Sequence, residues 1–281
     1  MNPAGTGGVS QIGAIVRAAA VSLLLAAPAL SEARGQEAPT LDSQAQSQPP
    51  PPVPSPWSFR VSPYVWFAGL SGDVGVNANL PVIDVDVDFS EIFHSIDWFP
   101  PPVMAAGEVR YGRFAFTTDL IFLGLDADHE ASRGPASVAA ELDLDTLVWA
   151  FGGSFRAIEQ DPVTLDLLVG GRLWNVDAKG TVTGFVARQR SGSQTWVDPI
   201  IGISGRVELG NGFALQAEGD VGGFGLVSDI DWQVLGTIQY QVADYLTLDA
   251  GYRYLAVDFD DGGFLFDVAL SGPIIGASIR F

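Results

Sequence analysis

Cysteine is absent from the sequence, histidine and methionine occur twice each, and Lys179 is the only lysine among 14 basic residues. Without cysteine the chain has neither a disulfide framework nor a thiolate metal site. The formal net charge of −19 leaves no basic stripe that could neutralise phosphates, which argues against nucleic-acid binding. No apolar run reaches the roughly 20 residues that a membrane-spanning helix needs. If this chain crosses a membrane, it does so with strands.

The N-terminal part has two regions with their own composition. Arg17 is the only positive charge before an apolar run from Ala18 to Ala27, and small residues follow in Ala27-Pro-Ala29 and Ser31-Glu-Ala33. Residues 1–33 are therefore predicted to be a cleaved signal peptide, because the run is too short for a membrane anchor. Residues 34–56 are rich in Gln, Ser and Pro and are predicted to be a disordered periplasmic tail.

From residue 57 to the C-terminus the sequence alternates between apolar and polar residues. At 246–256 the even positions are apolar and most odd positions polar, which is the period of a β-strand. Comparable strands are expected at about 57–76, 103–111, 114–125, 138–156, 163–177, 196–209, 213–221 and 230–242, with a last one ending at Phe281. In the fourth strand the apolar parity switches near Thr146, so a β-bulge is expected there.

Short and long connections alternate between these strands. Turns such as Gly112-Arg113, Glu159–Pro162, Gly210–Gly212 and Ala243-Asp244 are short, whereas the first, third and fifth connections are longer and acidic. The first contains Asp84, Asp86 and Asp88 and a helix-like piece at 90–97. The pattern predicts an all-β transmembrane antiparallel up-and-down barrel of about ten strands at 57–281, with eight or twelve as alternatives. Both termini are then periplasmic.

Aromatic residues gather near the predicted strand ends, as membrane-interface girdles require. The inner girdle is expected to contain Trp57, Phe59, Phe114, Tyr240 and Phe281, and the outer girdle Trp66, Trp98, Trp232 and Phe264.

The C-terminal stretch Gly276-Ala-Ser-Ile279-Arg-Phe281 resembles the assembly signal of Gram-negative outer-membrane β-barrels, although Ile274 stands where a polar residue is expected. The stretches PYVWFAGLSGDVG, WVDPIIG, GDVGGFGLVSDIDWQVLG and GYRYLAVDF resemble a group of uncharacterised proteobacterial outer-membrane proteins over roughly residues 57–281. The resemblance implies the barrel fold, an outer-membrane location and contact with the barrel-assembly machinery. It implies no established activity.

The polar face of the strands is expected to line the lumen. A soluble barrel or sandwich, the alternative, would carry many Lys, Glu and Gln on that face. Here it carries Gly, Ser and Thr with acids and arginines at similar heights, which suit paired charges in a narrow lumen. The predicted lumen charge network comprises Glu108, Arg110, Asp119, Asp166, Arg172, Asp198, Arg206, Glu218, Asp220, Asp249, Arg253 and Arg280.

No cofactor is indicated, and an enzyme is not expected. His94 and His129, both in outer connections, are the two candidate bases, but neither lies in a recognisable catalytic pattern. The acidic outer loops lack a calcium-loop signature, so solvation or loose contact with lipopolysaccharide is favoured over a specific site. About ten strands should be nearly filled by side chains. A structural or interaction role therefore leads, with a narrow cation-preferring channel or small-solute transporter as the alternative.

Overall fold

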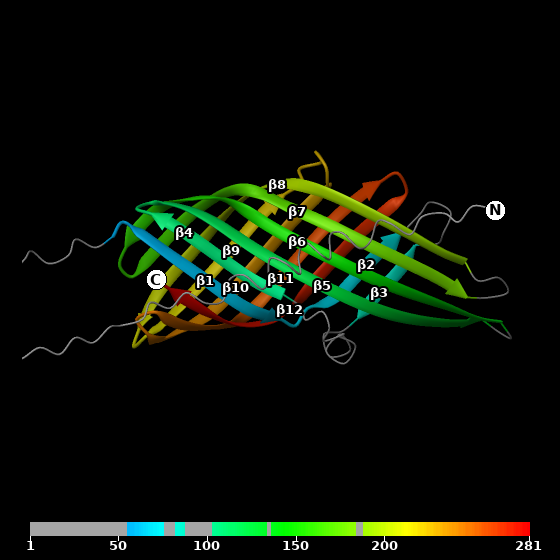
Figure 1. Ribbon diagram of the computed structural model, residues 1–281, viewed down its shortest axis with the longest axis horizontal. Helices are drawn as coiled ribbons and strands as arrows, with labels where there is room; N and C mark the ends of the chain where they lie inside the picture. The colour runs from blue at the N-terminus through cyan, green and yellow to red at the C-terminus, as the bar shows by residue number, and fades with distance from the viewer. Residues whose placement is uncertain (1–54, 76–81, 88–102, 134–135, 184–187) are drawn as a thin grey trace, which may run out of the picture. The chain divides into compact units, whose positions relative to one another are not determined.

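A computed structural model describes residues 55–75, 82–87, 103–133, 136–183 and 188–281. Its elements are all strands (Figure 1): β1 (Trp57–Trp66), β2 (Gly69–Gly75), β3 (Ile83–Val87), β4 (Val103–Tyr111), β5 (Phe114–Arg133), β6 (Ala136–Gln160), β7 (Val163–Thr183), β8 (Arg188–Gly210), β9 (Phe213–Gly222), β10 (Ile230–Ala243), β11 (Leu246–Asp261) and β12 (Phe264–Arg280). Among these residues no helix has the length and apolar character needed to cross a membrane.

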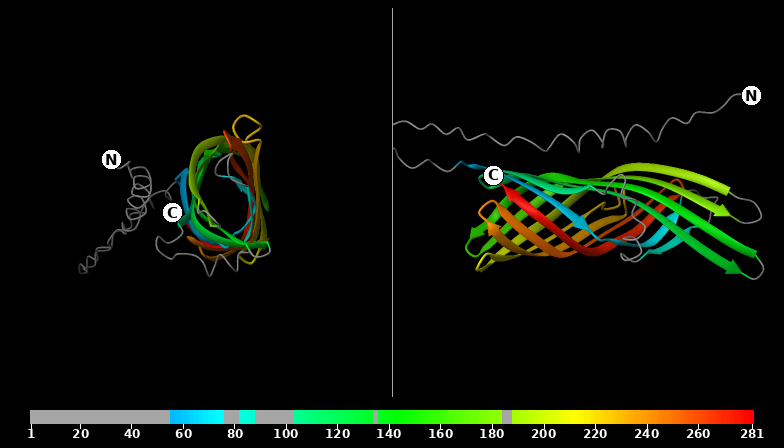
Figure 2. Two further views of the ribbon diagram at one scale, coloured as in Figure 1. Left: turned by 90° about the vertical axis from the view of Figure 1, so that its right-hand side faces the viewer. Right: turned by 60° about the horizontal axis from the view of Figure 1, so that its bottom comes forward.

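Ten of the strands close into an antiparallel barrel. The order runs β1-β4-β5-β6-β7-β8-β9-β10-β11-β12, and β12 pairs back onto β1. The closing seam is continued at its end by two backbone hydrogen bonds between Phe59 and Phe281, at 2.9 and 3.0 Å. The end-on view shows the ring (Figure 2). Closure leaves no free edge around the ring, which is what hydrocarbon requires of a sheet. The predicted ten-strand barrel is confirmed.

The remaining two strands, β2 and β3, form a hairpin on the N-terminal half of β12. The C-terminal half of β12, from Ile274, pairs with β1, and the half from Leu265 to Ser271 pairs with β2. The lower part of the barrel is the part nearer the short turns and the C-terminus, and the upper part is the opposite one. The first predicted strand is thus two strands separated at Phe67 and Ala68. The backbone at this break approaches β12 so closely that a Cβ on Gly272 would lie 1.8 Å from the carbonyl oxygen of Phe67. Only glycine fits there.

The lower outer surface of the barrel is apolar. On β7 the outward residues from Val163 to Leu173 include Leu165, Leu167 and Val169. That stretch is about 33 Å of strand, which a tilt of about 40° reduces to a band about 25 Å tall, the height of a membrane-embedded belt. Exposed aromatic residues border it at the short-turn end, including Trp57, Phe59, Tyr111, Phe114, Tyr240, Tyr245 and Phe281. All five residues predicted for the inner girdle are in this set.

One described loop belongs to the same apolar surface. The connection between β9 and β10 stands out from the ring (Figure 2) and exposes Phe224, Leu226 and Val227. It joins two outward apolar residues of the belt, Val221 and Ile230. It therefore extends the apolar belt sideways.

The belt ends where carboxylates first face outward. On β11, β12 and β2 these are Asp258, Asp267 and Asp73, which are direct neighbours in register. On β3 Asp84 continues this row, and Asp86 lies one outward position nearer the belt. Four carboxylates in one row cannot face hydrocarbon, so they mark the membrane boundary at the end of the barrel opposite the short turns. Asp84 and Asp86, predicted to lie in a loop, are instead part of β3.

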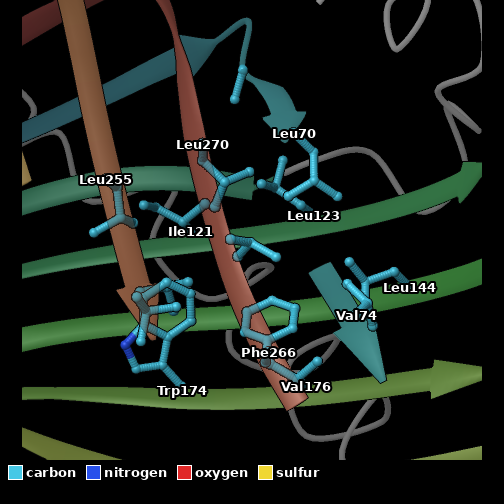
Figure 3. Close-up of a cluster of buried hydrophobic side chains, with 14 of the residues drawn as sticks. Leu70, Val74, Ile121, Leu123, Leu144, Trp174, Val176, Leu255, Phe266 and Leu270 are labelled. Atoms are coloured by element: carbon cyan, nitrogen blue, oxygen red, sulfur yellow. The ribbon is translucent and has the colours of Figure 1, made fainter. Parts of the chain in front are cut away.

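Inside the barrel, near this boundary, lies a cluster of buried apolar side chains that we call the plug (Figure 3). Trp174, Trp196, Phe259, Phe264 and Phe266 form its aromatic centre. The rings of Trp196 and Phe259 stack with their centroids 3.9 Å apart. Further members are Trp66, Leu70, Val74, Val85, Met104, Ile121, Leu123, Leu144, Val148, Val176, Leu255, Val257, Val268, Leu270 and Ile274.

The plug corrects two predictions. Trp66 and Phe264 are not in the outer girdle but buried in the plug, 3% and 4% exposed. There is no bulge at Thr146: the pairing of β6 with β7 is continuous there and shifts only between Arg156 and Ile158. The hydrophobic parity changes near Thr146 because the lumen itself changes from polar to apolar, while Leu144 and Val148 keep facing inward.

Several predictions lie outside the described residues. These are the signal peptide, nearly all of the Pro-rich tail, Asp88, the helix-like piece at 90–97 with His94, and Trp98. For His129 the structure describes the backbone alone, as part of β5.

Candidate functional site

Directly below the plug, the lumen contains a buried cation with two acid partners. Arg172 of β7 is fully buried and donates hydrogen bonds to Asp231 and, through Nη2, to both carboxylate oxygens of Asp220 at 2.8 and 2.9 Å. Trp174 donates its indole N–H to Asp231 Oδ2 at 2.9 Å. Charges at this depth persist only when paired. The cluster ties β7, β9 and β10 together across the lumen.

A neighbouring carboxylate holds the base of the apolar loop between β9 and β10. Asp198 is fully buried and accepts hydrogen bonds from the backbone N–H of Ser228 at 3.0 Å, from its hydroxyl at 2.6 Å, and from the indole N–H of Trp196 at 3.0 Å. One acid thus connects the plug to the loop.

Arg253 forms the second buried centre. Its Nη1 donates to Asp119 Oδ2 at 2.7 Å and to the hydroxyl of Tyr64 at 3.0 Å, and its Nη2 donates to Gln233 at 2.6 Å. Its guanidinium also lies 5.1 Å from the centroid of the Trp66 ring, a cation–π contact with the lower surface of the plug.

Closer to the short-turn end the contacts become a chain of polar groups. Gln239 donates to Asp249 at 2.7 Å, and Asp249 accepts from Ser278 at 2.8 Å. Ser278 in turn lies 2.8 Å from the hydroxyl of Ser62. Arg206 joins the chain by donating to the Gln239 side-chain oxygen at 2.7 Å.

On the opposite wall, Arg110 is the centre of a group of ion pairs. It bonds to Glu108 and, at 2.8 Å, to Asp166. Arg156 donates to the two oxygens of Asp166 at 2.9 and 3.1 Å. This bidentate contact matches the planar fork of a guanidinium.

Between these groups lies a cavity of about 220 Å³, lined by residues from all ten strands of the ring. At its deep end are Tyr64, Leu235 and Ile274, which belong to the plug or pack against it. At its other end are Arg60 and Arg206, whose side chains are 27% exposed. The cavity therefore opens toward the short turns and is closed by the plug.

The structure places all twelve residues of the predicted charge network on the lumen side of the wall, but not in one network. Arg172, Asp198, Asp220 and Arg253 are in the deep layer. Glu218 lies between the layers, with Gln233 Nε2 3.5 Å from it. Arg280 pairs in register with Arg60 at the open end and contacts no carboxylate among the described residues.

Sequence reasoning missed Asp231, Arg156, Tyr64 and the plug. Alternation alone could have placed Asp231 and Arg156 inside, because they share the parity of Gln233 and Ser154. Which acid pairs with each arginine depends on the relative register of strands around the tilted barrel. The sequence near the arginine does not indicate it. Within the described residues, no group of three or more Asp, Glu, His or Cys side chains is arranged to hold a metal ion.

Comparison with known proteins agrees with this architecture. The model of the YfaZ precursor family matches residues 127–281, more than half of the chain. The chain belongs to that family. No curated protein matches its sequence.

Among solved structures, the fold is similar to that of an outer membrane protein. The outer membrane protease OmpT from Escherichia coli has 10% identity and a TM-score of 0.55, with 80% of this chain and 97% of that chain covered. The translocator domain of the autotransporter NalP from Neisseria meningitidis has 10% identity, a TM-score of 0.42 and coverages of 80% and 88%. The attachment invasion locus protein Ail of Yersinia pestis has 14% identity, a TM-score of 0.28 and coverages of 81% and 99%. At these identities the similarity concerns the fold alone.

Arg172→Met tests how strongly the deep layer supports the barrel. The substitution leaves the carboxylates of Asp220 and Asp231 buried without their cation, which typically costs about 3–5 kcal/mol of unfolding free energy. Denaturant unfolding of the barrel in detergent measures the loss. The control is Arg113→Met, because Arg113 is about half exposed. It makes a 4.0 Å ion pair with Glu159 and a cation–π contact 5.9 Å from the Phe155 ring centroid, each worth at most about 1 kcal/mol at an exposed site. Equal losses in the two variants contradict the role given to Arg172.

Proposed function

We propose that the protein is an integral outer-membrane β-barrel with a structural or interaction role and a lumen closed to solutes. The plug is the observation that supports this proposal most directly. It fills the outer half of the lumen with apolar side chains, and Trp174, Val176, Leu255 and Phe266 among them are at most 1% exposed. Below it, Arg172 and Arg253 are tied across the lumen by charge-assisted hydrogen bonds. The cavity passes Arg253 and reaches Leu235 and Ile274 at the plug, so the plug is the layer that closes the lumen.

Planar-bilayer conductance tests this closure. The wild-type protein is expected to insert without current steps, with insertion shown by heat-modifiable gel migration. In the double variant Trp196→Ala, Phe259→Ala, removal of the stacked pair opens a path through the plug, and discrete steps are expected. The control is Trp232→Ala, Tyr254→Ala, which removes a pair of rings stacked 4.8 Å apart on the outer surface.

The alternative function, a narrow cation-preferring channel or small-solute transporter, predicts the opposite pattern. Cation-selective steps from the wild-type protein, unchanged by loss of Trp196 and Phe259, would refute the closed lumen. No catalytic role is proposed. The protease activity of OmpT is not transferred, because 10% identity carries the fold alone.

We also propose that the short turns and both termini face the periplasm and that β5–β8 extend outward. The four short turns gather at the end of the barrel where the C-terminus lies, while β5 to β8 reach far beyond the opposite end (Figures 1 and 2). Such asymmetry is typical of outer-membrane barrels. The extended strands would then meet lipopolysaccharide.

Cysteine labelling tests this orientation, since the sequence has no cysteine of its own. Ser193→Cys places a thiol on an exposed outward position of β8 beyond the belt, and Asp244→Cys places one in an exposed short turn. A membrane-impermeant maleimide added to intact cells is expected to label Ser193→Cys alone. Asp244→Cys should react only after the outer membrane is permeabilised. The reverse order would invert the proposed topology.

Gly276, Ile279 and Phe281 are proposed to act as the signal for the barrel-assembly machinery. Ile279 and Phe281 are exposed on the outer surface, and the Phe281 ring stacks on Phe59 with centroids 5.9 Å apart. Phe281→Ala is expected to lower the amount of assembled barrel in cells several-fold. Ile238→Ala, an exposed belt residue of β10, is the matched control. Both are quantified as the heat-modifiable fraction in outer membranes, and equal yields would exclude the signal.

A further inference from the structure

Five arginines line the open end of the lumen: Arg60, Arg110, Arg156, Arg206 and Arg280. We call this set the arginine mouth. Each lies at an inward-facing position of its strand, in line with cavity-lining residues such as Ser62, Ser154, Ser204 and Ser278. The acids among them are Glu108, Asp166 and Glu208, together with Glu159 near the end of β6 and Asp249 deeper inside.

The arginine mouth has more hydrogen-bond donors than its carboxylates satisfy. Arg60 and Arg280 are directly opposite each other in the β1–β12 pairing, so two like charges are adjacent. Arg60 reaches Glu108 only at 3.6 Å. For Arg280 no ion pair or hydrogen bond from its guanidinium occurs within the described residues.

Two buried donors at the same end also lack a partner. Arg110 is 6% exposed and Ser154 is 7% exposed, yet Arg110 Nη1 and Ser154 Oγ have no hydrogen bond among the described residues. Both pair in register with Ala115, from its two sides. Arg110 and Ser154 are thus separated by one small residue, and Ser154 lines the cavity. Buried donors left unpaired are costly, and an acceptor-rich group would satisfy them.

We propose that the arginine mouth binds a small soluble oxyanion, a phosphate or carboxylate, that enters the cavity from the short-turn side. Guanidinium forks match the oxygens of such groups in both spacing and charge. The arginines lie on the lumen side of the wall, which separates them from the headgroups of surrounding lipid. The deeper cavity has the acids Asp119, Glu218, Asp220 and Asp249, so the anion stays near the opening. The proposal does not depend on the plug remaining closed.

Titration of the protein, purified from outer membranes in neutral detergent, with inorganic phosphate tests the proposal. Isothermal calorimetry at fixed ionic strength, with chloride as the background anion, should show one saturable site. Arg280→Gln and Arg60→Gln are each expected to weaken binding about tenfold, because each removes a charged donor. Ser154→Ala removes one neutral donor and should weaken binding by a smaller factor.

Arg113→Gln is the matched control, because Arg113 lies in the turn at the same end but outside the lumen, with its side chain 53% exposed. It should bind phosphate as the wild-type protein does. Heat-modifiable migration of every variant verifies that the barrel is intact. Absence of saturable binding at millimolar phosphate overturns the proposal. So does equal weakening by Arg113→Gln, which would indicate an adventitious ion only.

Discussion

Hydrocarbon around the wall is the constraint on which the rest of this structure depends. Every backbone polar group at that depth must be paired within the sheet, so the ring closes through β1 and β12. The outward side chains must be apolar, which leaves the lumen as the only place for charge. The inward acids and arginines are consequently obliged to find one another there. The apolar belt, the closed seam and the ion pairs in the lumen all follow from the hydrocarbon that surrounds the barrel.

Beyond the row of outward-facing aspartates this constraint reverses. The row of Asp258, Asp267 and Asp73 faces water, and the lumen at that height becomes apolar. The upper part of the protein is therefore built like a soluble sandwich, with a core inside and polar groups outside. The part with the polar lumen and the part with the apolar core are formed by the same continuous strands. Arg253 lies where they meet, with its charge bonded to Asp119 and its flat face against Trp66.

Alternation in the sequence was sufficient to predict the ten strands of the ring and the polar face that lines the lumen below the plug, but not β3 or the break between β1 and β2. It failed where the environment changes along a strand, because periodicity reports the difference between two faces and not which of them is inside. Around Thr146 the apolar parity moves from the outer to the inner face, so the pattern predicts a bulge that the pairing of β6 with β7 does not contain. For the same reason it predicts Trp66 and Phe264 in the outer girdle, although both are in the plug. The pairing of Arg172 with Asp231 depends on three-dimensional register, which one strand's sequence does not encode.

The unequal heights of the strands have a consequence for what meets the cell's surroundings first. β6 continues from Asp145, its first outward-facing carboxylate beyond the belt, to Ala136, about 30 Å of additional strand at about 3.3 Å per residue. β7 and β8 rise beside it (Figure 1). In the proposed orientation, the hairpins β5–β6 and β7–β8 form a projection on one side of the barrel, which we call the blade. It extends beyond the lipid headgroups. A bacteriophage or an antibody would touch the blade long before it reached the plugged opening, so sequence change under such pressure should concentrate at its tip.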